Sequence, residues 1–212
     1  MNNTAQLFLY SFRRCPYAMR ARMALKISGL KIEVREILLK DKPSCMLGFS
    51  KKGTVPVLVV DQKTVIDESY DIMLWALKQN DPKNWLIDFE KNNTLIKECD
   101  QEFKPILDSY KYNDQNKKLQ QKSREDSFIF LNKIEKKLLK SSYLFSNEIT
   151  LADIAIFPFI RQYAYVDINW FEKSEFESIN IWLKKLIDSE LFKCIMLKKP
   201  IYNQAGEVFF LN

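Results

Sequence analysis

The chain has 212 residues, 47% of them hydrophobic, and a formal net charge of +6. Its lysines occur as short pairs among acidic residues, which is typical of solvated helix faces, so we do not expect nucleic-acid binding. Histidine is absent, which excludes every mechanism that needs a histidine base, including Cys-His and Ser-His-Asp arrangements. Four glycines are too few for glycine-rich phosphate loops.

The terminal sequence and the cysteines indicate the cellular compartment. Met1–Gln6 has neither a basic nor a long apolar region, and no later apolar run approaches the length of a membrane span. The four cysteines, Cys15, Cys45, Cys99 and Cys194, are far apart and form no CxxC pair. This spacing predicts neither a disulfide framework nor a metal site. We therefore expect a cytosolic protein with no membrane partner.

Cys15 lies at a predicted strand-to-helix turn. The apolar run Leu7–Tyr10 predicts a buried strand, and Met19–Lys26 is rich in strong helix formers. Pro16 falls at the first helical position, where its missing N–H group costs nothing. The thiol of Cys15 is therefore expected at the amino end of a helix, where unpaired backbone N–H groups point outward.

The charges around Cys15 favour a reactive thiol over a structural one. Free N–H groups at a helix start stabilise a thiolate, and Arg13 and Arg14 add positive charge just before it. The alternative is that Cys15 is a small buried hydrophobic residue, which is the commoner fate of a cysteine. Pro16 and the two arginines lead us to prefer the reactive thiol.

The rest of the first half predicts a small mixed sheet. Gly29 ends the first helix. Alternation, turn residues and helical spacing then predict, in chain order, a strand at Ile32–Ile37, a weak helix or loop up to Phe49, a strand at Gly53–Asp61, a turn at Gln62-Lys63, a strand at Thr64–Asp67 and a helix at Glu68–Gln79. The order βαβ followed by ββα is that of a thioredoxin-like domain with its active cysteine after strand one.

The second half predicts helices alone. Asn80–Trp85 breaks the pattern and indicates a linker. Helices are then expected at Asp88–Tyr112, Asn116–Lys140, Phe176–Ile187 and Ser189–Met196. Between the second and third of these, the Thr150-x-x-Asp153 capping box predicts the start of a buried helix that continues from Ile154. We therefore predict a thioredoxin-like α/β domain at residues 1–79, a linker at 80–87 and an all-α domain at 88–212.

Four features at fixed spacing carry a family resemblance over nearly the whole chain. They are the Cys15-Pro16-Tyr17-Ala18 turn, Lys42 thirteen residues before Val55-Pro56, Glu68-Ser69 thirteen residues after Val55, and the Thr150–Asp153 box. With these features the chain resembles the glutathione S-transferase superfamily. The likeness is greatest to its cysteine-type members, the omega class and the two-domain bacterial glutaredoxin.

The resemblance implies a site for the tripeptide glutathione. In the family the proline of the Val-Pro pair is cis, so Val55 beside a cis Pro56 would pair with the cysteinyl backbone of glutathione. Glu68 would take the γ-glutamyl ammonium, and Ser69 with the helix N-terminus would take its carboxylate. Lys42 would meet the glycyl carboxylate. Without the family spacing, Glu68 is simply an acid favoured by a helix dipole, and Lys42 a surface charge.

Cys15 and Tyr17 complete the implied site. Cys15 occupies the position at which omega-like members form a mixed disulfide with glutathione, and Tyr17 is expected among the glutathione-binding residues. Dithiol glutaredoxins have a second cysteine where this chain has Ala18. Exchange at Cys15 is therefore expected to be monothiol, with a second glutathione as resolver. Tyr10, Ser11 and Tyr17 leave open activation of glutathione's own thiol by a hydroxyl group, as in tyrosine- and serine-type transferases.

The resemblance also implies a place for the second substrate, between the domains. We expect Phe12, Phe103, Leu107 and Tyr110 to form its walls. Cys45 could approach the glycyl end of glutathione, although an incidental cysteine is the simpler interpretation.

The expected function is a glutathione-dependent thiol-disulfide oxidoreductase or transferase, with glutathione as co-substrate and no metal. The first alternative is a transferase that conjugates glutathione to organic electrophiles. The second is a non-catalytic interaction protein with the same fold. The family contains monomers and homodimers, and both states stay open for this chain.

Overall fold

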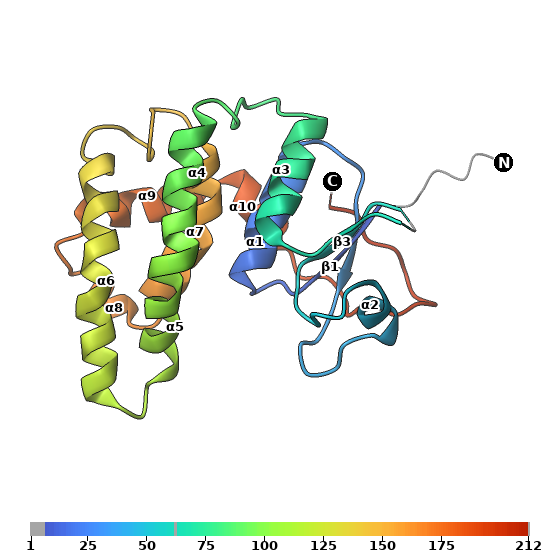
Figure 1. The fold of residues 1–212 in the computed structure, drawn as a ribbon, viewed down its shortest axis with the longest axis horizontal. Coiled ribbons are helices and arrows are strands. Elements are labelled where there is room, and N and C mark those ends of the chain that lie inside the picture. The colour runs from blue at the N-terminus through green and yellow to red at the C-terminus, as the bar shows by residue number, and fades with distance from the viewer. Residues whose placement is uncertain (1–6, 62, 212) are drawn as a thin grey trace. The chain divides into compact units, whose positions relative to one another are not determined.

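The chain folds into two compact units in a computed structural model that describes residues 7–61 and 63–211. The first unit contains the chain up to Lys83 together with the segment from Glu190 onward, and the second contains Asn84–Ser189 (Figure 1). Met1–Gln6 lies outside the described residues, and so does Gln62 of the predicted hairpin turn at Gln62-Lys63.

Four strands of the described residues form one mixed sheet in the first unit. They are β1 (Phe8–Ser11), β2 (Glu33–Glu36), β3 (Val57–Val59) and β4 (Val65–Ile66). The strand order is β2-β1-β3-β4, with β1 and β2 parallel and the other neighbours antiparallel. The βαβ and ββα order predicted from the sequence is thereby confirmed.

Helices cover both faces of this sheet. On one side α1 (Pro16–Ile27) packs against α3 (Ser69–Gln79) (Figure 1). On the other, α2 (Ser44–Phe49) contributes Met46 to a core with Tyr10 and Val57. Successive side chains of a strand point to opposite faces, so alternate residues of β1 supply the two cores.

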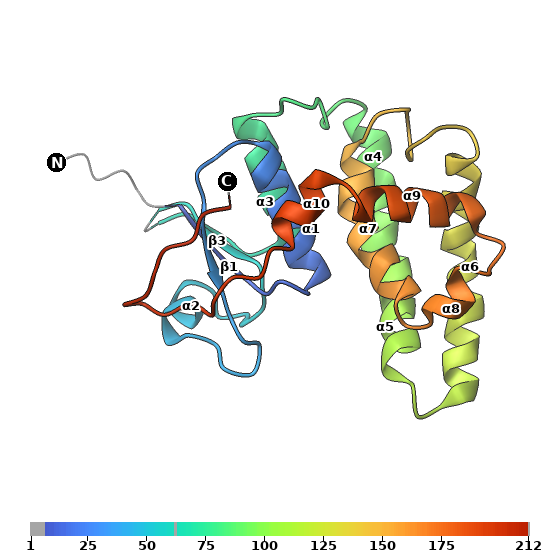
Figure 2. The ribbon, with the colours of Figure 1, turned by 180° about the vertical axis from the view of Figure 1, so that it is seen from behind.

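The carboxy-terminal segment belongs to the sheet unit, whereas the sequence placed it in the helical domain. Its helix α10 (Glu190–Ile195) packs against α1. The chain then follows β2, where the Val34 N–H donates to the Phe209 carbonyl at 2.7 Å and the Leu211 N–H donates to the Ile32 carbonyl at 2.9 Å (Figure 2). These bonds satisfy backbone groups at the edge of β2, which would otherwise be open to solvent.

Within its described residues the second unit is helical. Its elements are α4 (Phe89–Glu98), the π-helical turn η1 (Cys99–Phe103), α5 (Lys104–Tyr112), α6 (Lys117–Leu138), α7 (Leu151–Ala164), α8 (Ile168–Phe171) and α9 (Glu177–Ile187). The segment predicted as one helix up to Tyr112 is divided by η1. Pro105 follows that turn, and a proline inside a helix can neither donate to the carbonyl four residues earlier nor pack against it. No helix among the described residues combines the length and apolar character needed to cross a membrane.

Helix α7 is buried along most of its length, and Asp153 organises its start. The predicted capping box is present, with the Thr150 N–H donating to the Asp153 carboxylate at 2.8 Å. The same carboxylate accepts from the Leu144 N–H at 3.0 Å and from the Trp182 indole at 2.8 Å. One buried acid therefore holds the start of α7, the preceding loop and α9 together.

Replacing Asp153 with alanine is expected to destabilise the protein strongly. The change leaves three N–H groups without an acceptor, two of them buried, so we expect the free energy of unfolding to fall by about 3 kcal/mol or more. Urea denaturation followed by circular dichroism measures the loss. Asp126→Ala, on the exposed surface of α6, is the matched control, and equal effects of the two changes would contradict this role.

Candidate functional site

Cys15 lies where the sequence predicted it, between the end of β1 and the start of α1. It is the N-cap residue of α1, with Pro16 in the first helical position. Its N–H donates to the Phe12 carbonyl at 3.0 Å, and its carbonyl accepts from the Met19 N–H at 2.9 Å. These two bonds leave the half-buried thiol at the amino end of the helix, where the helix dipole favours negative charge.

A buried arginine holds the loop that carries Cys15. Arg22 is 2% exposed, and its guanidinium donates to the Ser11 hydroxyl and, at 2.7 Å, to the Arg13 carbonyl. Glu36 accepts from the Arg13 N–H at 2.6 Å. Burial lowers the pKa of Arg22 to about 10, while the negative charges of Glu36 and Cys15 act in the opposite direction. Arg22 therefore stays charged at neutral pH and lies within electrostatic reach of Cys15.

The Val55-Pro56 pair lies beside the thiol. Its peptide bond is cis, as the family resemblance implied. The Cys15 sulfur lies 3.7 Å from the Val55 carbonyl oxygen, and the Val55 N–H makes no hydrogen bond within the described part of the chain. The Lys42 ammonium lies next to Gly53, 3.9 Å from the point where a Cβ atom of Gly53 would be. Three of the predicted residues thus converge on the turn before β3.

The start of α3 carries Glu68 and Ser69. Glu68 is the N-cap residue, and its side chain does not cap the helix. Ser69 is 2% exposed, and its hydroxyl accepts from the Arg20 guanidinium at 3.0 Å. The guanidinium of Arg20 also lies 5.3 Å from the centre of the Tyr17 ring. The Ser69 hydroxyl thus accepts one bond and keeps its own hydrogen, but it is almost fully buried.

Lys52 also lies at the start of α3, next to Glu68, and the sequence did not predict this position. Its ammonium lies 2.6 Å from Glu68 and 3.0 Å from Asp67. Asp67 also accepts from the Ser50 hydroxyl at 2.6 Å, and this bond, with that from Lys52, lowers the pKa of Asp67. The sequence showed only a Lys51-Lys52 pair of the solvent-facing kind, because nothing in it joins a lysine to acids fifteen and sixteen residues later.

The hydroxyl groups at the end of β1 are committed elsewhere. Tyr10 is fully buried, and its hydroxyl donates to the Cys45 sulfur at 3.2 Å and accepts from Arg35 at 3.1 Å. Burial raises the pKa of Tyr10 above its ordinary value. Ser11 is fully buried too, and its hydroxyl accepts from Arg22. Neither group is therefore available to a ligand thiol.

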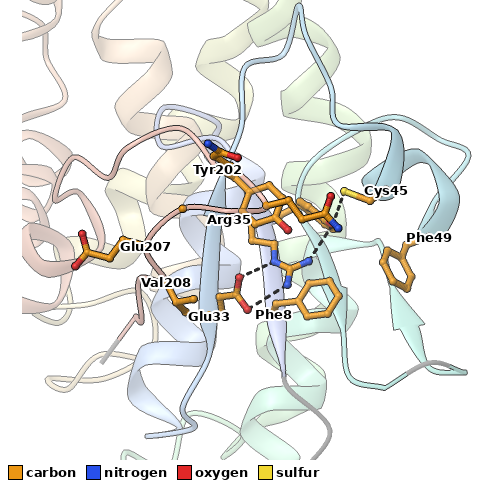
Figure 3. Close-up of a pocket in the computed structure, with 12 residues that line it drawn as sticks. Phe8, Glu33, Arg35, Cys45, Phe49, Tyr202, Glu207 and Val208 are labelled. Carbon is orange, nitrogen blue, oxygen red and sulfur yellow. Dashed lines mark hydrogen bonds and ion pairs between the residues drawn. The ribbon is translucent and has the colours of Figure 1, made fainter.

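A separate cavity of about 360 Å³ lies between β1, β2, α2 and the carboxy-terminal segment (Figure 3). Arg35 lies at its centre, with its guanidinium 2.7 Å from Glu33 and 3.6 Å from the centre of the Phe8 ring. Cys45 and Tyr202 line the same cavity. The Cys45 thiol thus lies among aromatic side chains, with the Tyr10 hydroxyl as its partner.

The predicted walls of a second-substrate site are mostly core residues, so that prediction is wrong for three of them. Phe103, Leu107 and Tyr110 have no exposed surface. Phe103 stacks on Phe130 at 4.8 Å within the helical unit, and the Tyr110 ring lies 4.9 Å from the Tyr163 ring of the same unit. Helical spacing identified an apolar face but could not tell a core from an open surface. Phe12, in the sheet unit, is half-buried.

None of the cysteines among the described residues forms a disulfide. Cys99 is buried, whereas Cys15, Cys45 and Cys194 are half-buried. Residues 7–61 and 63–211 contain no group of three or more cysteine, aspartate and glutamate side chains that could hold a metal ion.

A thioredoxin-like sheet unit whose first helix begins at a cysteine, followed by a helical unit, defines the class of fold. Two family models agree with it: "Glutathione S-transferase, N-terminal domain" matches residues 9–85, and "Glutathione S-transferase, C-terminal domain" matches residues 98–190. The chain belongs to the glutathione S-transferase superfamily.

Individual relatives point to the omega class. The chain is 42% identical to glutathione S-transferase omega-1 of Mus musculus over 64 residues, which are 30% of this chain and 27% of that protein. It thus matches little more than a quarter of that relative's length. Identity to the Sus scrofa omega-1 protein is 26% over 197 residues, which are 91% of this chain and 77% of that protein.

Solved structures share the fold at low identity. Glutathione transferase Omega 3C from Trametes versicolor has a TM-score of 0.78 and 20% identity, with 93% of this chain and 92% of that chain covered. A family member from Pseudomonas fluorescens, solved with two glutathione bound, has a TM-score of 0.77 and 16% identity, with 92% and 94% covered.

Replacing Arg22 with methionine is expected to loosen the Cys15 loop and slow the reaction of its thiol. The loop loses hydrogen bonds to a hydroxyl and to backbone carbonyls, and the thiolate loses a nearby positive charge, so alkylation by iodoacetamide at pH 7 should slow by about threefold or more. Peptide mass spectrometry measures the rate at Cys15. Lys26→Met, in the last turn of α1, should leave that rate unchanged. If Arg22→Met also leaves it unchanged, Arg22 does not act on the thiol.

Proposed function

We propose that the protein is a glutathione-dependent thiol-disulfide oxidoreductase, a transferase of the omega-like kind, that uses Cys15 in a monothiol mechanism. One observation carries the proposal: the Cys15 thiol lies at the amino end of α1, 3.7 Å from the Val55 carbonyl. A thiol held beside the backbone that would bind the cysteinyl part of glutathione is placed for sulfur-to-sulfur exchange.

Glutathione would bind along the sheet unit with its thiol toward Cys15. The Val55 N–H and C=O groups would pair with its cysteinyl backbone, as an added strand does. Glu68 would take the γ-glutamyl ammonium, the first turn of α3 its carboxylate, and Lys42 the glycyl carboxylate. The grouping of Lys42, Val55 and Cys15 around one turn supports this orientation.

The reaction proceeds by two exchanges of sulfur. The Cys15 thiolate attacks the glutathione sulfur of a mixed disulfide, so a Cys15–glutathione disulfide forms and the other thiol leaves. The thiolate of a second glutathione then attacks the glutathione sulfur of that adduct, which yields oxidised glutathione and restores the Cys15 thiolate. Ala18, at the position of a resolving cysteine, is buried and has no sulfur, so the second glutathione is required.

Two of the three hydroxyl groups that could activate the glutathione thiol, those of Tyr10 and Ser11, are engaged elsewhere, whereas Tyr17 is half-buried. The two engaged groups favour this mechanism over conjugation. A conjugating transferase would need a hydroxyl group that donates to the glutathione thiolate. Tyr10 and Ser11 are buried and hydrogen-bonded to other residues. The cysteines of the described residues form no disulfide, which suits the reducing cytoplasm. We place the reaction there, with glutathione and a small disulfide or electrophile as the partners.

Cys15→Ala is expected to abolish glutathione-dependent reduction of the mixed disulfide of glutathione and 2-hydroxyethanethiol, because the attacking sulfur is lost. Intact mass after exposure to oxidised glutathione should show one adduct that Cys15→Ala lacks. Cys194→Ala, which removes another half-buried thiol of the sheet unit, should retain full activity. Activity that survives in Cys15→Ala would point instead to conjugation, which an electrophile assay detects.

Glu68→Gln is expected to weaken glutathione binding by about tenfold, because an ion pair with an ammonium is replaced by a hydrogen bond to an uncharged amide. Isothermal titration calorimetry with reduced glutathione gives the Kd. Asp71→Asn, which removes an exposed acid from the first turn of the same helix, should change the Kd little. Equal effects of the two changes would show only a general influence of negative charge.

A further inference from the structure

The carboxylate assigned to the ammonium of glutathione is already occupied by an ammonium of the chain itself. The Lys52 Nζ atom lies between Glu68 and Asp67, at 2.6 Å and 3.0 Å. The Ser50 hydroxyl fixes the other oxygen of Asp67 at 2.6 Å. Lys52 is thus held at two points, and one of them is Glu68.

The two ammonium groups are chemically alike. The γ-glutamyl group of glutathione presents a primary ammonium on a saturated carbon, as a lysine side chain does, and both seek carboxylate oxygens. The Glu68 side chain is 64% exposed and that of Lys52 48% exposed, so a ligand can reach both. An exposed ion pair of this kind is weak and exchanges readily.

We propose that Lys52 competes with the γ-glutamyl ammonium for Glu68 and thereby sets the affinity of the site for ligands with a free amino group. This inference rests on the proposed function, because it takes Glu68 as the residue that receives that ammonium. When glutathione binds, Lys52 leaves Glu68 and stays with Asp67, which Ser50 holds in place. The competition weakens glutathione binding without any change at Cys15.

The neighbouring lysine provides a matched comparison. Lys51 precedes Lys52 and is also exposed, and it makes no interaction within the described part of the chain. Lys51→Met and Lys52→Met remove the same charge from adjacent positions. A general effect of net charge on the anionic tripeptide must therefore appear in both variants, whereas competition for Glu68 must appear in Lys52→Met alone.

The test compares two probes by calorimetry, reduced glutathione and N-acetylglutathione, which keeps the thiol and the glycyl carboxylate but has no ammonium. Lys52→Met should bind glutathione about two- to fivefold more tightly than the wild type, the range expected for release of an exposed ion pair. Its affinity for N-acetylglutathione should not rise. Lys51→Met should match the wild type with both probes, and Lys52→Met should give no gain in a Glu68→Gln background.

Each other outcome has a distinct meaning. Weaker glutathione binding by Lys52→Met would overturn the inference and make Lys52 a contact of the ligand's carboxylate. Unchanged binding would overturn it as well, because Lys52 would then have no influence. If the wild type and all variants fail to bind glutathione while their unfolding midpoints are unaltered, the proposed function falls with the inference, and this result is separate from the other two.

Discussion

The buried guanidinium of Arg22 is the interaction on which the geometry around Cys15 depends. It bonds to the Ser11 hydroxyl and the Arg13 carbonyl, and these groups belong to the connection that carries the chain from β1 into α1. Residues seven apart on a helix lie two turns from one another on nearly the same side, so Arg22 reaches back along α1 to the loop before Cys15. Burying a charge is costly unless it is hydrogen-bonded. The two terminal nitrogens of Arg22 make these bonds, whereas its buried Nε atom has no partner among the described residues. The bonds of the terminal nitrogens fix the loop, and a loop fixed in this way holds the thiol at the start of the helix.

The carboxy-terminal segment completes the same region from the opposite end of the chain. Arg13 donates to the Met196 carbonyl at 3.4 Å, and the backbone beyond Met196 follows β2. The surroundings of Cys15 thus depend on Met196, which lies 183 positions after Arg13 in the sequence. Local pattern cannot reveal such a contact, because the segment has no strand-like alternation and pairs only where β2 offers an edge.

The parts that sequence reasoning predicted correctly are those with a local cause. Pro16 after a strand-like run predicted the start of α1, and the Thr150–Asp153 spacing predicted the box at the start of α7. The parts it missed depend on packing between distant segments. Phe103 and Tyr110 show helical spacing, which gives the apolar face but not what covers it. The pairing of Lys52 with Glu68 requires the turn before β3 to meet the start of α3, and no periodicity encodes that meeting.

Two hydroxyl groups near Cys15, those of Tyr10 and Ser11, are engaged inside the sheet unit, which supports the proposed role of the sulfur. A polar side chain at the end of β1 could in principle activate a thiol bound beside it. In this chain the Tyr10 hydroxyl points into the cavity with Cys45 and Arg35, and Ser11 is bound to Arg22. Each therefore serves the core rather than the ligand. The thiol of Cys15 lies at a helix N-terminus with a cation within reach, so it has both the setting of a nucleophile and an accessible position.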